Sequence, residues 1–148
     1  WNLRIIGEGS MRTKLEQRIG ELGLQQRVTL PGWIQPAWEE LAQATLFALP
    51  SRYEGFPSTL LEAMASGVPS IAVDCPSGPG AVIENGVNGL LVQNDTASLS
   101  AGMLRMIGEP EFRESLGRAS QRIVDQFNWD TMVDAYERLL ASVVERKD

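Results

Sequence analysis

Residues 46–73, LFALPSRYEGFPSTLLEAMASGVPSIAV, contain a strand, a loop, a helix and a second strand in immediate succession. The runs Leu46–Leu49 and Ser70–Val73 are short and apolar, as in strands that are buried on both faces of a parallel sheet. Between them, the composition predicts a loop over Pro50–Pro57 and a helix over Thr59–Ser66. A strand, a loop, a helix and a strand in this order form the repeating unit of an α/β fold.

The same alternation continues on both sides of this segment. Further strands are predicted at Leu3–Gly7, Arg27–Leu30 and Gly89–Val92, and helices after Ser10, which would be the N-cap, and over Ala37–Ala44. The last third is helical by periodicity: apolar faces run from Leu99 to Ile107, from Phe112 to Phe127 and from Met132 to Val143. We therefore expect one α/β domain over residues 1–148, with a Rossmann-like, doubly wound parallel sheet and a helical C-terminal third.

Composition excludes several classes of function. The chain has no histidine, which removes Ser-His-Asp and Cys-His catalysis and any histidine-bearing metal site. Its formal net charge is −6 and no Lys/Arg cluster interrupts the acidic surface, so a nucleic-acid groove is not expected. The single cysteine, Cys75, cannot form an internal disulfide and is expected to be a small buried side chain. No apolar run is long enough to span a membrane.

The loop and helix after residue 50 carry the chemistry. A loop after a parallel strand lies at the carboxyl end of the sheet, where open α/β folds bind ligands. The first turn of the helix offers backbone N–H groups at Ser58, Thr59 and Leu60, and together with the helix dipole these attract a phosphate. Glu54 and Glu62 flank this turn, and carboxylates accept hydrogen bonds from sugar hydroxyls. The pattern therefore fits a sugar nucleotide.

A purely structural interpretation of the same residues is also open. Thr59-x-x-Glu62 matches a capping box, in which Glu62 would cap its own helix. Glu54 could be a solvated loop carboxylate.

The segment PSRYEGFPSTLLEAMASGVPSIA, residues 50–72, resembles the E-x7-E signature of the retaining glycosyltransferases of the large group-1 family (family 4). Other stretches resemble that family in the same order: LRIIGEGSMRTKLEQ (3–17), VTLPGW (28–33), DCPSGP (74–79) and ENGVNGLLV (84–92). The resemblance implies the donor-binding, C-terminal domain of a two-domain enzyme with the GT-B fold, a hexosyltransferase type that retains anomeric configuration without an essential metal.

The resemblance also implies roles for individual residues. Glu54 and Glu62 would form the catalytic pair, with Glu62 on the ribose of the nucleotide and Glu54 on hydroxyls of the donor sugar. The remaining residues implied in donor binding are Gly7, Gly9, Trp33, Ile34, Ser51, Phe56, Pro57, Ser58, Thr59 and Leu60. The glycines would allow close approach of the backbone, and Trp33 and Ile34 would lie by the base. The absence of an Asp-x-Asp pair agrees with metal-free chemistry.

The substrates and setting follow from the same resemblance. The donor would be a nucleoside-diphosphate sugar, expected to be UDP-linked, and no cofactor is expected. The acceptor would be a glycan or lipid-linked molecule in polysaccharide biosynthesis, held by an N-terminal domain that this chain lacks. We expect a cytoplasmic protein, peripheral at the inner membrane face in its full-length form, and an inactive fragment in isolation.

Two departures from the family matter. After Gly78-Pro79-Gly80, Ala81 stands where relatives usually carry a glutamate, which weakens any role for this loop in substrate contact. By the same resemblance, the family's first strand–helix unit, with an Arg and a Lys that neutralise the diphosphate, is expected to be missing. In the order 3-2-1-4-5-6 that strand would lie between the strands Leu3–Gly7 and Leu46–Leu49, so these either pair directly or recruit another chain.

Other interpretations remain. Gly7-Glu8-Gly9 hints at a dinucleotide fingerprint, but Arg12 stands at its third glycine and no acid follows the second strand. A related nucleotide-sugar epimerase or phosphorylase, or a non-catalytic α/β interaction module, would share the fold. Trp38 could stack on a base or sugar, although packing is the more common role of such a side chain, and Trp129 is expected in the core.

Overall fold

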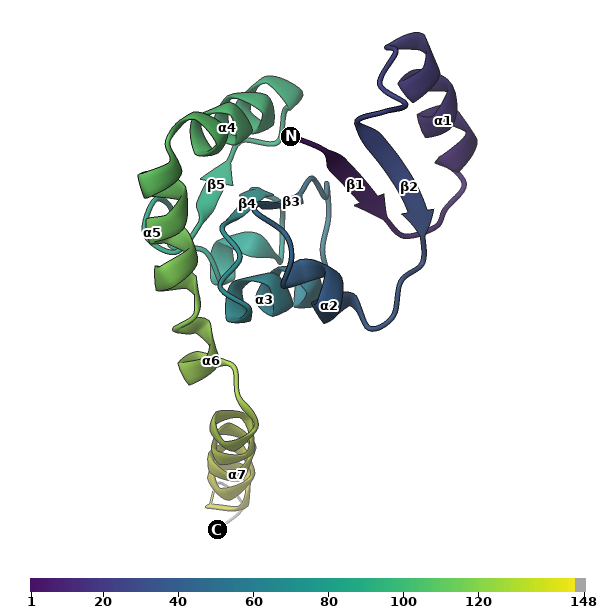
Figure 1. The fold of residues 1–148 in the computed structure, drawn as a ribbon. Helices are drawn as coiled ribbons and strands as arrows, with labels where there is room; N and C mark the ends of the chain where they lie inside the picture. Colours follow the sequence, from purple (N-terminus) through teal and green to yellow (C-terminus); the bar gives the residue numbers. More distant parts are fainter. Residues whose placement is uncertain (146–148) are drawn as a thin grey trace. The chain divides into compact units, whose positions relative to one another are not determined.

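The computed structural model describes residues 1–145, so positions 146–148 of the predicted domain lie outside the described part. The chain divides into two compact units, Trp1–Ala37 and Trp38–Asp148. All strand pairs in both units are parallel and alternate with helices along the chain, which confirms the predicted α/β fold class (Figure 1).

The first unit is a single βαβ motif made of β1 (Leu3–Ile6), α1 (Arg12–Glu21) and β2 (Val28–Gly32). β1 and β2 pair in parallel. Gly23 follows α1 with φ +66°, the left-handed conformation that glycine favours after a helix. The predicted cap at Ser10 is wrong: the N-cap is Met11, and no side chain caps the helix. None of the residues of α1 is buried.

The second unit holds the core. Its elements are α2 (Ala37–Leu41), β3 (Phe47–Leu49), α3 (Ser58–Ala65), β4 (Ser70–Val73), the 3-10 turn η1 (Pro79–Ala81), β5 (Leu90–Val92), α4 (Thr96–Gly108), α5 (Pro110–Ser120), α6 (Ile123–Gln126) and α7 (Trp129–Glu145). The sheet order is β3-β4-β5, and β4 in the centre has all four residues buried.

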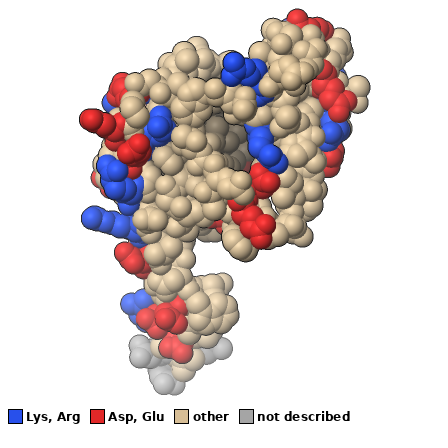
Figure 2. Space-filling view, in the orientation of Figure 1, with Lys and Arg blue, Asp and Glu red and all other residues tan. Residues whose placement is uncertain are grey.

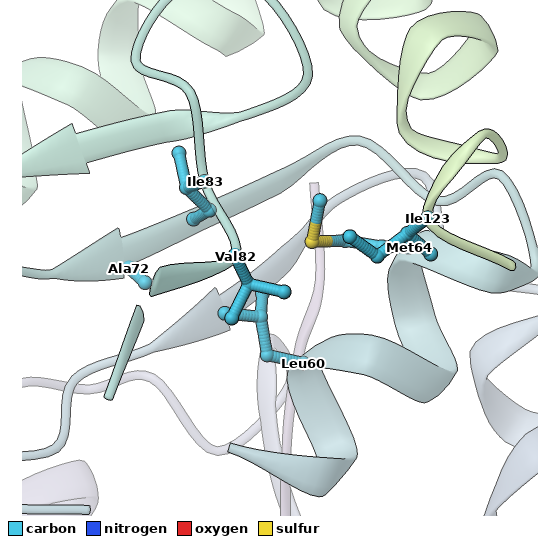
Figure 3. Packing of buried hydrophobic residues seen from close by; sticks show 6 residues of the cluster. All are labelled: Leu60, Met64, Ala72, Val82, Ile83 and Ile123. Atoms are coloured by element: carbon cyan, nitrogen blue, oxygen red, sulfur yellow. The ribbon is translucent and has the colours of Figure 1, made fainter. Parts of the chain in front are cut away.

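Adjacent residues of β4 face opposite layers because side chains alternate along a strand. Ile71 packs with Met106 of α4 and Leu116 of α5. Ala72 packs with Leu60 and Met64 of α3 on the other face (Figure 3). Helices therefore cover both faces of this sheet, as expected of a doubly wound fold (Figure 1).

The predicted C-terminal helices need two corrections. The periodicity from Phe112 to Phe127 predicts one helix, but α5 ends at Ser120 and a separate helix, α6, begins at Ile123. At the break, the Ser120 hydroxyl lies within hydrogen-bond distance of two carbonyls, that of Gly117 in its own helix at 2.8 Å and that of Met64 in α3 at 3.0 Å. Contact with α3 therefore accompanies the end of α5. Trp129, predicted to lie in the core, is 73% exposed at the start of α7.

The strands form two separate ladders. β1 pairs with β2 in the first unit, and β3 pairs with β4 in the second. That the edges of β1 and β3 either pair directly or recruit another chain stays a prediction.

Gly117 allows α5 to lie directly on the end of α3. A methyl group at this position would lie 2.6 Å from the Gly67 carbonyl oxygen and 3.0 Å from Pro69 Cγ. We expect Gly117→Ala to lower the free energy of unfolding by about 1–2 kcal/mol, since overpacking outweighs the gain in helix propensity. Urea denaturation followed by circular dichroism measures this difference.

Gly108→Ala is the matched control, because a methyl group there meets no atom within 4 Å. It should leave the stability unchanged or raise it slightly. If the two variants have the same stability, the close packing at Gly117 does not limit the fold.

Candidate functional site

The candidate site lies in the second unit, where the chain leaves β3 and enters α3. We call residues 50–57 the Glu54 loop. The loop at 74–78 follows β4 in the same way. Because β3 and β4 are parallel neighbours, both loops emerge at the carboxyl edge of the sheet.

The first turn of α3 differs from the prediction at Ser58. Its backbone N–H donates to the Phe56 carbonyl at 2.9 Å, across Pro57 with φ −82° and ψ 61°. These angles are those of an inverse γ-turn. The Ser58 amide is therefore already bonded and is not available to a phosphate in this conformation.

Leu60 and Pro57 anchor the turn instead of lining its open side. Leu60 has no exposed surface and belongs to the core with Met64 and Ile123 (Figure 3). Pro57 is also buried. The exposed residues of the turn are therefore Ser58 and Thr59, which offer two hydroxyls and the Thr59 N–H. The Thr59 N–H lies in the first turn, where no carbonyl of the helix accepts its hydrogen bond. The turn therefore offers an anion one backbone N–H group, where the sequence predicted three.

The capping-box interpretation of Glu62 is wrong. The N-cap of α3 is Pro57 and no side chain caps the helix, so Thr59 and Glu62 are not at the positions that a capping box needs. Glu62 is exposed on the helix surface. Among the hydrogen bonds and ion pairs of the described residues, none uses its carboxylate, which is therefore accessible to a ligand.

Glu54 is half-buried against the loop that follows β4. Its Cβ lies close to Gly78, because a methyl group on Gly78 would lie 2.9 Å from it. Cys75 is buried, as predicted. Burial raises the pKa of the Cys75 thiol, the Glu54 and Asp74 carboxylates raise it further, and the Glu54 amide acts in the opposite direction. The Cys75 thiol is thus an uncharged, buried side chain beside the Glu54 loop.

Phe56 points away from the core and is 59% exposed. Its ring lies 6.1 Å from the ring of Phe127, at an interplanar angle of 54°. Such tilted pairs are favourable. The Glu54 loop therefore contacts the segment between α6 and α7, a contact that the sequence pattern did not indicate because Phe127 was assigned to a helix face. Ser51, also in this loop, is half-buried.

Four of the residues predicted to bind the nucleotide-sugar donor lie in the first unit. Gly7 has φ +121°, which requires glycine, whereas Gly9 has no such constraint. Both line a depression of about 220 Å³ beside Arg12. Trp33 is 74% exposed and Ile34 is half-buried. The roles of these four residues remain predictions.

Arg12 is committed to the structure of that unit. It bonds the Leu30 carbonyl at 2.9 Å and forms ion pairs with Glu8 and Glu16. A long, bonded side chain at the third position of the glycine pattern is unlike the dinucleotide fingerprint.

The surface charges are mixed. Over α4 and α5, Arg105 pairs with Glu109 and Arg118 with Glu114, and Figure 2 shows acidic and basic residues interspersed there. In the described part of the chain, no three His, Cys, Asp or Glu residues come together to hold a metal ion. Within residues 1–145, no helix is long and apolar enough to cross a membrane.

The fold and the site define an α/β domain in which an exposed helix turn, the exposed Glu62 and the half-buried Glu54 lie at the carboxyl edge of a parallel sheet. The chain belongs to the family described as glycosyl transferases group 1, whose model matches residues 1–123.

Relatives with curated names agree with this family. An exopolysaccharide phosphotransferase of Streptomyces coelicolor is 40% identical over 150 residues, covering 100% of this chain and 16% of that protein. Lipopolysaccharide 1,6-galactosyltransferases of Salmonella typhimurium and Escherichia coli are 39% and 33% identical, over 78% and 99% of this chain and 34% and 42% of theirs. The chain thus spans less than half of each of these relatives.

Solved structures share the fold. A mutant of S. aureus TarM, in complex with fondaparinux, alpha-GlcNAc-glycerol and UDP, superposes with a TM-score of 0.86 at 25% identity, over 93% of this chain and 28% of that one. The apo form of the lipopolysaccharide outer core galactosyltransferase WaaB gives 0.83 at 33% identity, over 96% and 41%.

Proposed function

We propose that this chain is the nucleotide-sugar-binding part of a two-domain retaining glycosyltransferase. Its donor is a UDP-sugar, and the sugar passes to a glycan or lipid-linked acceptor in polysaccharide assembly. The observation that carries the proposal is the exposed first turn of α3 with accessible Glu54 and Glu62 on either side. The UDP complex of TarM and the two lipopolysaccharide galactosyltransferases support the donor and acceptor classes.

In this proposal, each of the two carboxylates binds a different part of the donor. Glu62 accepts hydrogen bonds from the ribose, and Glu54 accepts them from the transferred sugar, because carboxylate oxygens suit paired hydroxyls. Ser58 and Thr59 bind the diphosphate through their hydroxyls and the Thr59 amide, assisted by the dipole of α3. Ser51 and Phe56 line the same loop.

The chemistry is proposed to need no metal and no cofactor. The diphosphate charge would be offset by the helix dipole and by groups of the longer protein. That protein would work in the cytoplasm, close to the inner membrane face when the acceptor is lipid-linked.

The test is calorimetric titration of the chain with UDP and several UDP-sugars, with GDP-sugars for comparison. We expect weak, saturable binding of the UDP compounds at millimolar concentrations, since the chain carries a net charge of −6. Addition of EDTA should leave the affinity unchanged.

The alternatives give different results. An inert interaction module would bind no nucleotide at millimolar concentration. An epimerase would convert the bound sugar without an acceptor, and a phosphorylase would require inorganic phosphate. A loss of affinity in EDTA that Mg²⁺ or Mn²⁺ restores would overturn the metal-free proposal.

A further inference from the structure

The loop at 74–78 comes closest to Glu54 at Gly78. A methyl group on Gly78 would lie 2.9 Å from the Cβ of Glu54 and 3.5 Å from its Cγ. Real Cβ atoms essentially never approach another atom to less than 3.0 Å. Only glycine at this position therefore leaves room for the stem of Glu54 where the structure has it.

Cys75 lies beside Gly78 in the same loop. A methyl group on Gly78 would lie 3.5 Å from Cys75 Sγ. Gly78 therefore adjoins both Glu54 and Cys75. Ser77, between Cys75 and Gly78, has φ +61°, a left-handed conformation that turns the chain back.

The loop is held firmly on both sides. It follows β4, whose four residues are all buried, and it leads into Pro79, which has no exposed surface. Gly78 itself is buried, whereas Tyr53 and Phe56 of the Glu54 loop are exposed. The backbone at Gly78 is therefore the better packed partner in this contact.

We propose that Gly78 and Cys75 form a seat that positions Glu54 toward the donor sugar. The inference rests on the proposed function, because it assumes that Glu54 contacts sugar hydroxyls. Gly78 and Cys75 act through Glu54 and do not touch the substrate themselves. The loop at 74–78 thus takes an indirect part in substrate recognition in this proposal, although Ala81 weakens a direct one.

The experiment compares Gly78→Ala with Gly80→Ala. At Gly80 a methyl group would meet Asp74 and Leu91 only at 3.5 and 3.7 Å, which is ordinary contact, so this variant is the matched control. We expect Gly78→Ala to weaken binding of UDP-sugars roughly tenfold, because a charge-assisted hydrogen bond is lost, and to leave binding of UDP unchanged. Gly80→Ala should bind both as the wild type does.

A double-mutant cycle with Glu54→Gly makes the test specific. In that background the Cβ of residue 54 is absent, so Gly78→Ala should cause no further loss of UDP-sugar affinity. By thermal melting, its effect should also be smaller than in the wild type. Three results would each overturn the proposal. Gly78→Ala could weaken the affinities for UDP and UDP-sugars equally, or leave both unchanged. It could also lower the melting temperature as much in the Glu54→Gly background as in the wild type.

Failure of the proposed function has a separate signature. A folded wild-type chain that binds neither UDP nor UDP-sugars would overturn the proposed function and, with it, the role of the seat in sugar binding. A wild type that binds both, with Gly78→Ala indistinguishable from it, would overturn only the seat.

Discussion

Glu62→Gln should weaken UDP binding by about 1.5–3 kcal/mol, or roughly 10- to 150-fold. The amide keeps the size of the side chain but removes the charge that strengthens hydrogen bonds from ribose hydroxyls. Glu54→Gln should leave UDP binding unchanged, because the proposed partner of Glu54 is the sugar and UDP contains only the ribose. Calorimetric titration of both variants with UDP measures the difference.

Glu111→Gln is a suitable control, since Glu111 is exposed in the first turn of α5, on a different element from the site. Thermal melting checks that each variant is folded. Because Glu62 does not cap α3, its replacement should have little effect on the melting temperature. Equal effects of Glu62→Gln and Glu54→Gln on UDP affinity would contradict the division of roles between the two carboxylates.

The sequence predicted best where one local pattern determined the outcome. The apolar run Ser70–Val73 is the central strand with the bounds expected of it, because burial on both faces demands such a run. The position of α3 was predicted within one residue at each end, and Gly67 follows it with φ +74°. The order of the strands and helices from β1 to α4 follows from the same periodicities.

Features that depend on tertiary contacts were predicted less well. The break after α5 is associated with the bond from Ser120 to Met64, two residues 56 positions apart in sequence. The spacing of apolar residues from Phe112 to Phe127 does not depend on that long-range contact, so the pattern predicts one continuous helix. The exposure of Trp129 was likewise not predictable from its amino-acid type alone.

The site shows the same division. The sequence placed Glu54, Glu62 and the turn between them on one strand–loop–helix unit, as the structure has them. It could not show that the Ser58 amide is bonded to Phe56, because that depends on the ψ angle of Pro57, which the proline ring leaves free. It also gave no sign that Gly78 lies against Glu54, since proximity between two loops comes only from the pairing of β3 with β4.

The second large effect concerns turnover: the chain in isolation should bind UDP-sugars without transferring the sugar. Transfer requires the acceptor to be held against the donor, and such positioning can account for about 7–11 kcal/mol of a barrier. The lipopolysaccharide galactosyltransferases are more than twice as long as the part matched here, which is 34–42% of their length. The acceptor-holding groups are therefore expected outside this chain. Incubation with UDP-sugars and simple acceptors, with UDP release as the readout, measures transfer.

Release of UDP should not exceed the rate of spontaneous hydrolysis, and the Glu62→Gln variant provides the baseline, because it lowers donor occupancy without adding a new group. Turnover above that baseline in the wild type, dependent on acceptor and lost in Glu62→Gln, would show that these 148 residues contain the whole catalytic apparatus. Absence of turnover together with saturable UDP-sugar binding is the expected result. It would show that donor recognition at the edge of β3 and β4 can occur without acceptor positioning, which the proposed function assigns to groups outside these residues.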